Sequence, residues 1–206
     1  MVPFLAQIRD ETGVTLSDLN LGGGYGVRYT QEDEAIDIPA RLKELAAHLK
    51  EETERLGLPM PRFLMEPGRS IMADAGMTLY TVGSVKRIPG YKQYAAVDGG
   101  MTDNPRYALY QSRYTVYHAH KSGSMERFDV VGRCCESGDI IQPGVELPGD
   151  TCRGDILAVC TTGAYNYSMA SNYNRLPRPA VVMLTPDRIY EAVRRETFAD
   201  LTALDL

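Results

Sequence analysis

The 206-residue sequence predicts an α/β segment followed by an all-β domain. Two observations predict this division. Helical and strand-like patterns alternate over residues 1–75, which is typical of parallel strands joined by helical crossovers. Residues 76–206 instead carry short β-rich runs bounded by Gly, Pro or Asp, a spacing typical of an antiparallel barrel or sandwich. We therefore expect two domains, 1–75 and 76–206.

The first domain is expected to contain two helices and two strands in alternation, over residues 3–12, 14–21, 37–56 and 62–65. Gly13 can end the first helix, and the Gly22-Gly23-Gly24 run stops the first strand. The second helix has the strongest pattern, with apolar residues at i, i+3, i+4 and i+7 after Pro39. Two strands and two helices cannot close a barrel, so this domain is expected to be the end of a larger one.

The second domain is expected to contain short strands over residues 77–87, 93–97, 114–118, 128–132, 156–161 and 180–184. A last helix is expected after Thr185-Pro186-Asp187, which can cap it. Ile189, Tyr190 and Val193 would form its apolar face. The second domain is therefore predicted to be a β domain with a C-terminal helix.

Composition and charge exclude several classes of protein. The net charge is −5 and no basic block occurs, so a nucleic-acid surface is not expected. No apolar run is long enough to span a bilayer, and the N-terminus lacks the pattern of a secretory signal, so no membrane partner and a cytoplasmic location are expected. The four cysteines contain no CxxC, which argues against a structural metal site. Disulfides are disfavoured in such a protein.

Two motifs of the first domain suit an anionic or aromatic ligand. Gly22-Gly23-Gly24 directly follows a strand, where backbone N–H groups can hold a phosphate, although a tight turn would need the same residues. Glu66 ends the next strand, and a buried carboxylate there would need a cation such as a protonated ring nitrogen. Arg69 could grip a carboxylate or phosphate. A capped loop with a surface ion pair is the alternative for these two residues.

Two further motifs lie in the second domain. Arg106 and Tyr110 are four residues apart, so on one helical turn they would face the same carboxylated ligand. A surface turn is the alternative. Tyr165 follows Gly163-Ala164 and could lie against a flat ligand, or pack in the core. His118 and His120 would share a strand face, but no third metal ligand is evident and solvent-facing histidines are expected.

Taken in order, GGGYG, EPGR, DNPRYALY, CESGD and GAYNYSM resemble the motifs of the diaminopimelate decarboxylase family. These are pyridoxal 5'-phosphate enzymes of the alanine-racemase-like class, fold type III. The resemblance implies that residues 1–75 are the last βα units of a cofactor-binding TIM barrel and that 76–206 form the β domain. It also implies decarboxylation of meso-2,6-diaminopimelate to L-lysine and CO2, a step of lysine biosynthesis.

The resemblance assigns roles to individual residues. Cys135 would be catalytic, as the proton donor to the carbon that loses CO2, whereas Cys134 would only pack; strand alternation would send the two thiols to opposite faces. The residues implied in cofactor binding are Gly23, Gly24, Glu66, Gly68, Arg69 and Tyr165. Those implied in substrate binding are Arg69, Arg106, Tyr110, Glu136 and Tyr165. Because the CESGD segment reaches the neighbouring subunit's site in this family, a homodimer with shared active sites is implied.

One departure concerns the lysine that binds the cofactor covalently in this family. None of the five lysines has the expected context; they are Lys43, Lys50, Lys86, Lys92 and Lys121. The chain is therefore expected to be the C-terminal half of the enzyme and to be inactive alone, the N-terminal half lying on the same or a separate polypeptide. The alternatives are a decarboxylase of ornithine, arginine or carboxynorspermidine, or a non-catalytic binding or regulatory remnant.

Overall fold

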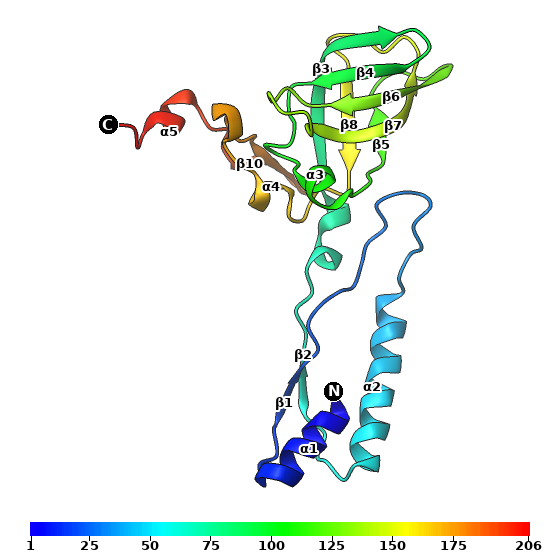
Figure 1. The fold of residues 1–206 in the computed structure, drawn as a ribbon, viewed down its shortest axis with the longest axis vertical. Coiled ribbons are helices and arrows are strands. Elements are labelled where there is room, and N and C mark those ends of the chain that lie inside the picture. Colours follow the sequence, from blue (N-terminus) through cyan, green and yellow to red (C-terminus); the bar gives the residue numbers. More distant parts are fainter. The chain divides into compact units, whose positions relative to one another are not determined.

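A computed structural model describes all residues, 1–206, and divides the chain into two compact units (Figure 1). Unit 1 comprises Met1–Arg28 and Asp33–Ile71, and unit 2 comprises Tyr29–Glu32 and Met72–Leu206. The sequence predicts a domain boundary after residue 75, whereas the compact units divide after Ile71. None of the helices combines the length and apolar character that a bilayer-spanning helix needs.

Unit 1 is a strand–helix–strand crossover with a preceding helix. Its elements are α1 (Val2–Thr12), β1 (Asp18–Asn20), α2 (Ile38–Arg55), β2 (Arg62–Leu64) and the short helix η1 (Arg69–Ile71). β1 and β2 pair in parallel, with Asn20 opposite Leu64. Gly13 ends α1 with φ 73°, and the Asp37 side chain accepts a hydrogen bond from Ala40 N at the start of α2. The helices and the parallel pairing are as the sequence predicts.

The first strand is shorter than predicted. Residues 14–17 are exposed, and β1 begins only at Asp18, where β2 becomes available as a partner. The core of unit 1 is built where the helices cover this short pair, from Val2, Leu5, Ala6, Leu19, Leu49 and Leu58. A strand needs a neighbour for its backbone hydrogen bonds, so pairing rather than apolar pattern sets its length.

Unit 2 is built on one six-stranded sheet that curls into a nearly closed barrel. The strands lie in the order β5 (Val116–His118), β8 (Ile156–Cys160), β3 (Met77–Ile88), β4 (Lys92–Val97), β6 (Met125–Val131), β7 (Ile140–Pro148). The edge strands β5 and β7 approach each other. Phe128, Ile141 and Leu157 are fully buried inside. Of the two predicted architectures, the structure therefore shows the barrel.

Two features of the barrel differ from the prediction. β7 was not predicted from the sequence, because Pro143 and Gly144 interrupt its strand pattern. The strand forms nevertheless, since β6 pairs with it before and after the register shifts between Phe128 and Val131. In addition, β4 and β6 pair in parallel, with Tyr94 opposite Asp129. The sheet is therefore mixed and not purely antiparallel.

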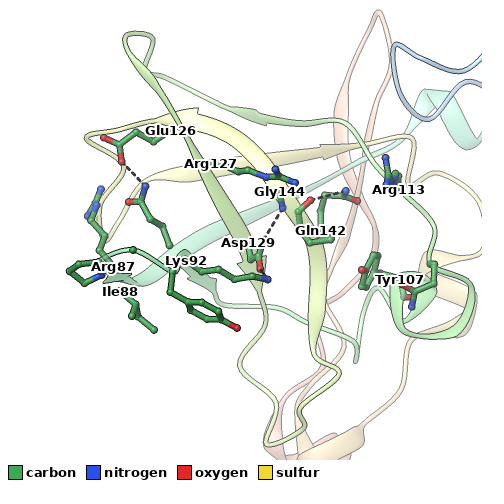
Figure 2. A pocket seen from close by; sticks show the side chains of 16 residues that line it. Arg87, Ile88, Lys92, Tyr107, Arg113, Glu126, Arg127, Asp129, Gln142 and Gly144 are labelled. Carbon is green, nitrogen blue, oxygen red and sulfur yellow. Dashed lines mark hydrogen bonds and ion pairs between the residues drawn. The ribbon is translucent and has the colours of Figure 1, made fainter.

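A polar groove of about 1090 Å³ lies on the outside of unit 2, along β6 and β7 and the turn between β3 and β4 (Figure 2). An ion pair of Lys92 Nζ and Asp129 Oδ2 lies within it at 2.6 Å. None of the predicted site residues lines this groove.

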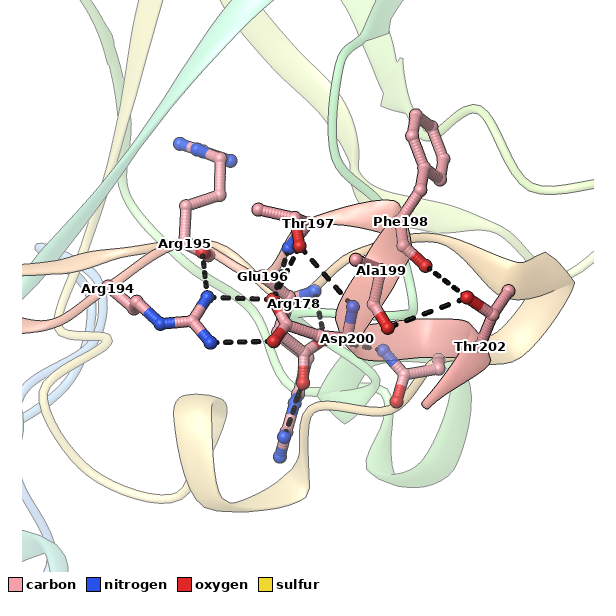
Figure 3. Close-up of polar contacts among 10 residues, drawn as sticks. Arg178, Arg194, Arg195, Glu196, Thr197, Phe198, Ala199, Asp200 and Thr202 are labelled. Carbon is pink, nitrogen blue, oxygen red and sulfur yellow. Dashed lines mark hydrogen bonds and ion pairs between the residues drawn. The ribbon is translucent and has the colours of Figure 1, made fainter. Parts of the chain in front are cut away.

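The predicted last helix is wrong. Residues 189–193 form a strand, β10 (Ile189–Val193), that pairs antiparallel with β9 (Val181–Leu184). Thr185 and Arg188 close the hairpin, because Thr185 N donates to Arg188 O at 3.0 Å. The C-terminal helix begins later, as α5 (Phe198–Thr202), with a capping box between Thr197 and Asp200 (Figure 3). The spacing of the apolar residues fits either period, and pairing with β9 decides for the strand.

Candidate active-site residues

The glycine loop after β1 lies against the backbone that follows β2. Pairing continues beyond the strands, since Leu21 N donates to Leu64 O at 2.9 Å and Glu66 N donates to Gly22 O at 2.8 Å. A Cβ on Gly23 would lie 2.3 Å from the Glu66 carbonyl oxygen, so a side chain has no room there. Gly24 has φ +98°, a conformation that favours glycine. The loop is therefore a close backbone approach at the carboxyl end of two parallel strands.

Asn20 connects this loop to the Glu66 carboxylate and was missed by the sequence analysis. Its Nδ2 donates to Glu66 Oε1 at 2.6 Å, while its Oδ1 accepts from Gly22 N at 2.8 Å. The signal was available, because Asn20 is the last residue of β1 and the ends of parallel strands meet at one edge. Glu66 is exposed, so its carboxylate can reach a ligand. Arg69 follows at the start of η1.

Arg106 is a buried cation without an acidic partner. It begins the short helix α3 (Arg106–Tyr110), and it is 5% exposed. The guanidinium carbon lies 5.3 Å from the ring centres of both Tyr110 and Tyr165. One polar neighbour is the neutral Ser112 Oγ, 3.5 Å from Nη2, and Nε has no hydrogen-bond partner. The predicted helical turn is present, and the alternative of a surface turn does not fit a buried guanidinium.

Tyr165 is held in a strained conformation. It precedes α4 (Asn166–Met169) with φ 71° and ψ −36°, which costs a non-glycine residue roughly 1–3 kcal/mol. The preceding loop is pinned to the short helix η2 (Ala73–Ala75), since Gly163 N donates to Ala73 O at 2.9 Å. Tyr165 is 38% exposed, so it is not a core residue. The surrounding contacts hold Tyr165 in this conformation, which leaves its ring beside Arg106.

Cys134 and Cys135 lie in a bend between β6 and β7 and not on a strand, so the expected alternation of the two thiols does not apply. Cys135 is exposed, and its N–H donates to Asn174 Oδ1 at 2.7 Å. Cys134 is half-buried. Burial raises the pKa of its thiol, and the nearby Asp139 carboxylate raises it further. Both are free thiols. The two cysteines thus differ in access to solvent.

Glu136 presents an ionised carboxylate beside Cys135. Its Oε1 accepts from Gly138 N at 3.3 Å, and its Oε2 accepts from the Tyr173 hydroxyl at 3.2 Å. These bonds lower the pKa of Glu136 below its usual value, and the bond from Gly138 N has the largest effect. The carboxylate is exposed and has no cationic partner in the chain. It can therefore accept an ammonium group.

The segment that carries Cys135 and Glu136 is anchored by Asp139. This side chain is 4% exposed, and its two oxygens accept from Met101 N and Cys134 N, each at 2.6 Å. Gly100 and Gly132 leave space for it, because a Cβ on either would lie within 2.6 Å of a carboxylate oxygen. Asp139 is a second residue that the sequence analysis did not single out.

Lys92, Lys121 and His118 contact aspartates of the β domain and none of the predicted site residues. Lys92 pairs with Asp129, and Lys121 Nζ lies 2.7 Å from Asp155 Oδ2. The expectation of solvent-facing histidines is wrong for His118, whose side chain is 2% exposed with Nε2 at 3.1 Å from Asp155 Oδ2. It is buried because β5 packs on β8, next to Asp155.

Residues 16–163 match the family model described as the C-terminal sheet domain of pyridoxal-dependent decarboxylases. The chain belongs to this family. Pyridoxal dependence and the decarboxylase class, which the resemblance implied, are thus confirmed at the level of the family. The roles of individual residues remain predictions.

Three known proteins show the extent of the similarity. Diaminopimelate decarboxylase of Bacillus subtilis (strain 168) is 47% identical over 204 residues, which cover 98% of this chain and 46% of the relative. The solved diaminopimelate decarboxylase of M. jannaschii in complex with L-lysine has a TM-score of 0.87 at 32% identity, covering 99% of this chain and 46% of that one. A lysine/ornithine decarboxylase of Vibrio vulnificus with cadaverine has a TM-score of 0.69 at 27% identity, covering 84% and 46%. The chain therefore spans about half the length of its relatives.

Proposed function

We propose that the chain is part of a pyridoxal-phosphate enzyme that decarboxylates meso-diaminopimelate to L-lysine and CO2. Residues 1–75 would be the last βα units of a TIM barrel, with the β domain following. The enzyme would be a cytoplasmic homodimer in which the CESGD segment serves the neighbouring subunit's site. The similarity to diaminopimelate decarboxylases over nearly the whole chain supports this proposal.

The observation that carries the choice of substrate is Arg106. A guanidinium that is 5% exposed and has no carboxylate partner is unfavourable unless a ligand supplies the anion. The end of diaminopimelate that stays intact carries a carboxylate and an ammonium group. Arg106, with Arg69 and Tyr110, would bind that carboxylate, and Glu136 would bind the ammonium. Ornithine and arginine have no carboxylate at that end.

The residues of unit 1 fit the cofactor. The glycine loop has no side chains where an anion would approach, and its N–H groups would hold the phosphate. The Glu66 carboxylate, oriented by Asn20, would accept a hydrogen bond from the protonated pyridine nitrogen. When bound, pyridoxal phosphate withdraws electrons from the carbon that loses CO2.

Proton delivery falls to Cys135. Its thiol is exposed, and its backbone is held by Asn174 and through Asp139. It would give its proton to the carbon from which CO2 has left. Tyr165 would contact the cofactor with its constrained ring. Without the covalent lysine, this chain alone is expected to be inactive, and the N-terminal half must supply that residue.

The test is to assemble the chain with the N-terminal half of the enzyme and measure CO2 release from meso-diaminopimelate, L-ornithine and L-arginine. Diaminopimelate should be preferred, and Arg106→Leu should remove most of kcat/KM for it. Arg153→Leu, at an exposed arginine, is the control. A preference for ornithine would reverse the substrate assignment. Absence of any decarboxylation by the assembled enzyme would favour the non-catalytic alternative.

A further inference from the structure

Three buried polar side chains of unit 2, none of them acidic, lack hydrogen-bond partners as Arg106 Nε does. Asn104, Tyr114 and Asn166 are 1%, 4% and 4% exposed. The hydroxyl of Tyr114 and both amide atoms of Asn104 and Asn166 have no hydrogen-bond partner that meets normal geometry, nor has Arg106 Nε. Buried polar atoms are nearly always satisfied, so each of these unpartnered groups calls for an explanation.

Tyr114 and Asn166 lie close to the guanidinium. Burial raises the pKa of Tyr114, while the Arg106 charge and a poorly aligned hydrogen bond from Asn166 oppose that rise, so the Tyr114 hydroxyl lies near both side chains. Asn166 directly follows Tyr165, whose ring lies against Arg106. Tyr114 is itself fixed, since its N–H donates to Gln142 Oε1 at 2.9 Å and its ring meets Tyr29 edge-on.

The neutrality of these neighbours is the informative property. Arginines are commonly oriented in protein interiors by carboxylates, which also neutralise them. Here the nearby polar side chains are an amide and a phenol, which can orient the guanidinium through weak polar contacts without cancelling its charge. A carboxylate ligand then meets an uncompensated cation in a water-poor site, where the attraction is strongest.

We propose that Asn166 and Tyr114 are positioning residues that hold Arg106 for the substrate carboxylate while leaving its charge unneutralised. This inference rests on the proposed function. It adds that these two residues set the selectivity for a ligand with a distal carboxylate. Neither residue has to touch the reacting atoms. Their effect should therefore appear in the binding of carboxylate ligands and not in the chemical step.

The test compares two ligands of the assembled enzyme, L-lysine and L-lysinamide, by calorimetric titration. The two differ in a carboxylate against a neutral amide of nearly the same shape. Asn166→Asp would place a carboxylate beside Arg106, and we expect L-lysine to bind at least about tenfold more weakly, since an ion pair now competes. L-lysinamide should change by less than about twofold. Ser122→Asp adds the same charge on an exposed loop and should leave both affinities unchanged.

Tyr114→Phe is the second variant, because it removes one hydroxyl and keeps the ring. We expect a loss of about three- to tenfold for L-lysine and none for L-lysinamide. In steady-state assays both variants should raise KM for diaminopimelate and keep kcat within about threefold. Equal losses for both ligands would mean a general structural role and would overturn the inference. Unchanged L-lysine affinity in both variants would overturn it as well. A wild-type enzyme that does not decarboxylate diaminopimelate would refute the proposed function itself.

Discussion

Replacing Asp139 by Asn removes the negative charge that holds the Cys135–Glu136 segment to the barrel. In the wild-type chain the two carboxylate oxygens accept from Met101 N and Cys134 N, each at 2.6 Å, and the side chain is 4% exposed. Asparagine keeps one acceptor oxygen but turns an NH2 group toward the other backbone N–H. One charge-assisted hydrogen bond is lost and the second is weakened.

The size of the effect follows from these contacts. A hydrogen bond to a charged group contributes about 1.5–3 kcal/mol, so we expect a destabilisation of about 3 kcal/mol. With a urea m-value of about 2 kcal/mol/M, the unfolding midpoint should fall by about 1.5 M. The assay is urea unfolding of the chain followed by circular dichroism.

Glu146→Gln is the matched control, because it makes the same charge change at an exposed position of β7. Its midpoint should stay within about 0.3 M of the wild-type value, since substitutions at exposed positions have small effects. An Asp139→Asn chain that unfolds at the wild-type urea concentration would show that the carboxylate does not anchor this segment.

Three further predictions concern other parts of the chain. Cys135 should react with iodoacetamide at pH 8 faster than Cys134, because burial raises the pKa of Cys134. In the assembled enzyme, Cys135→Ala should nearly abolish turnover, whereas Cys134→Ala should not. Equal labelling rates and equal losses of turnover would contradict the roles assigned to the two cysteines. The hydrogen bond from Arg178 lowers the pKa of Glu196 to about 2, so the ionised Glu196 stabilises the C-terminal hairpin above pH 4.5. This stability, measured by hydrogen exchange, should fall as the pH drops from 4.5 toward 2. Glu196→Gln should remove the pH dependence. Asn20→Leu should weaken pyridoxal phosphate binding to the assembled enzyme about tenfold, measured by absorbance titration, because it breaks both bonds that Asn20 makes; unchanged affinity would separate Asn20 from the cofactor.

Within unit 1 the sequence by itself determined the helices and the order of elements. Gly13 ends α1, and Asp37 with Pro39 begins α2; these local signals need no distant partner. The motifs that placed the chain in its family are also local. The length of β1 was not determined by local sequence, because the strand extends only where β2 pairs with it.

Tertiary structure alone decided the features that depend on distant partners. β7 forms across Pro143 because β6 pairs with it, and β10 is a strand because β9 is beside it. The same applies to the site. Asn20 and Asp139 matter through bonds to Glu66 and Met101, respectively 46 and 38 residues away in the sequence. Hydrogen bonds between residues far apart leave no periodic trace, so a single sequence does not contain them as a pattern.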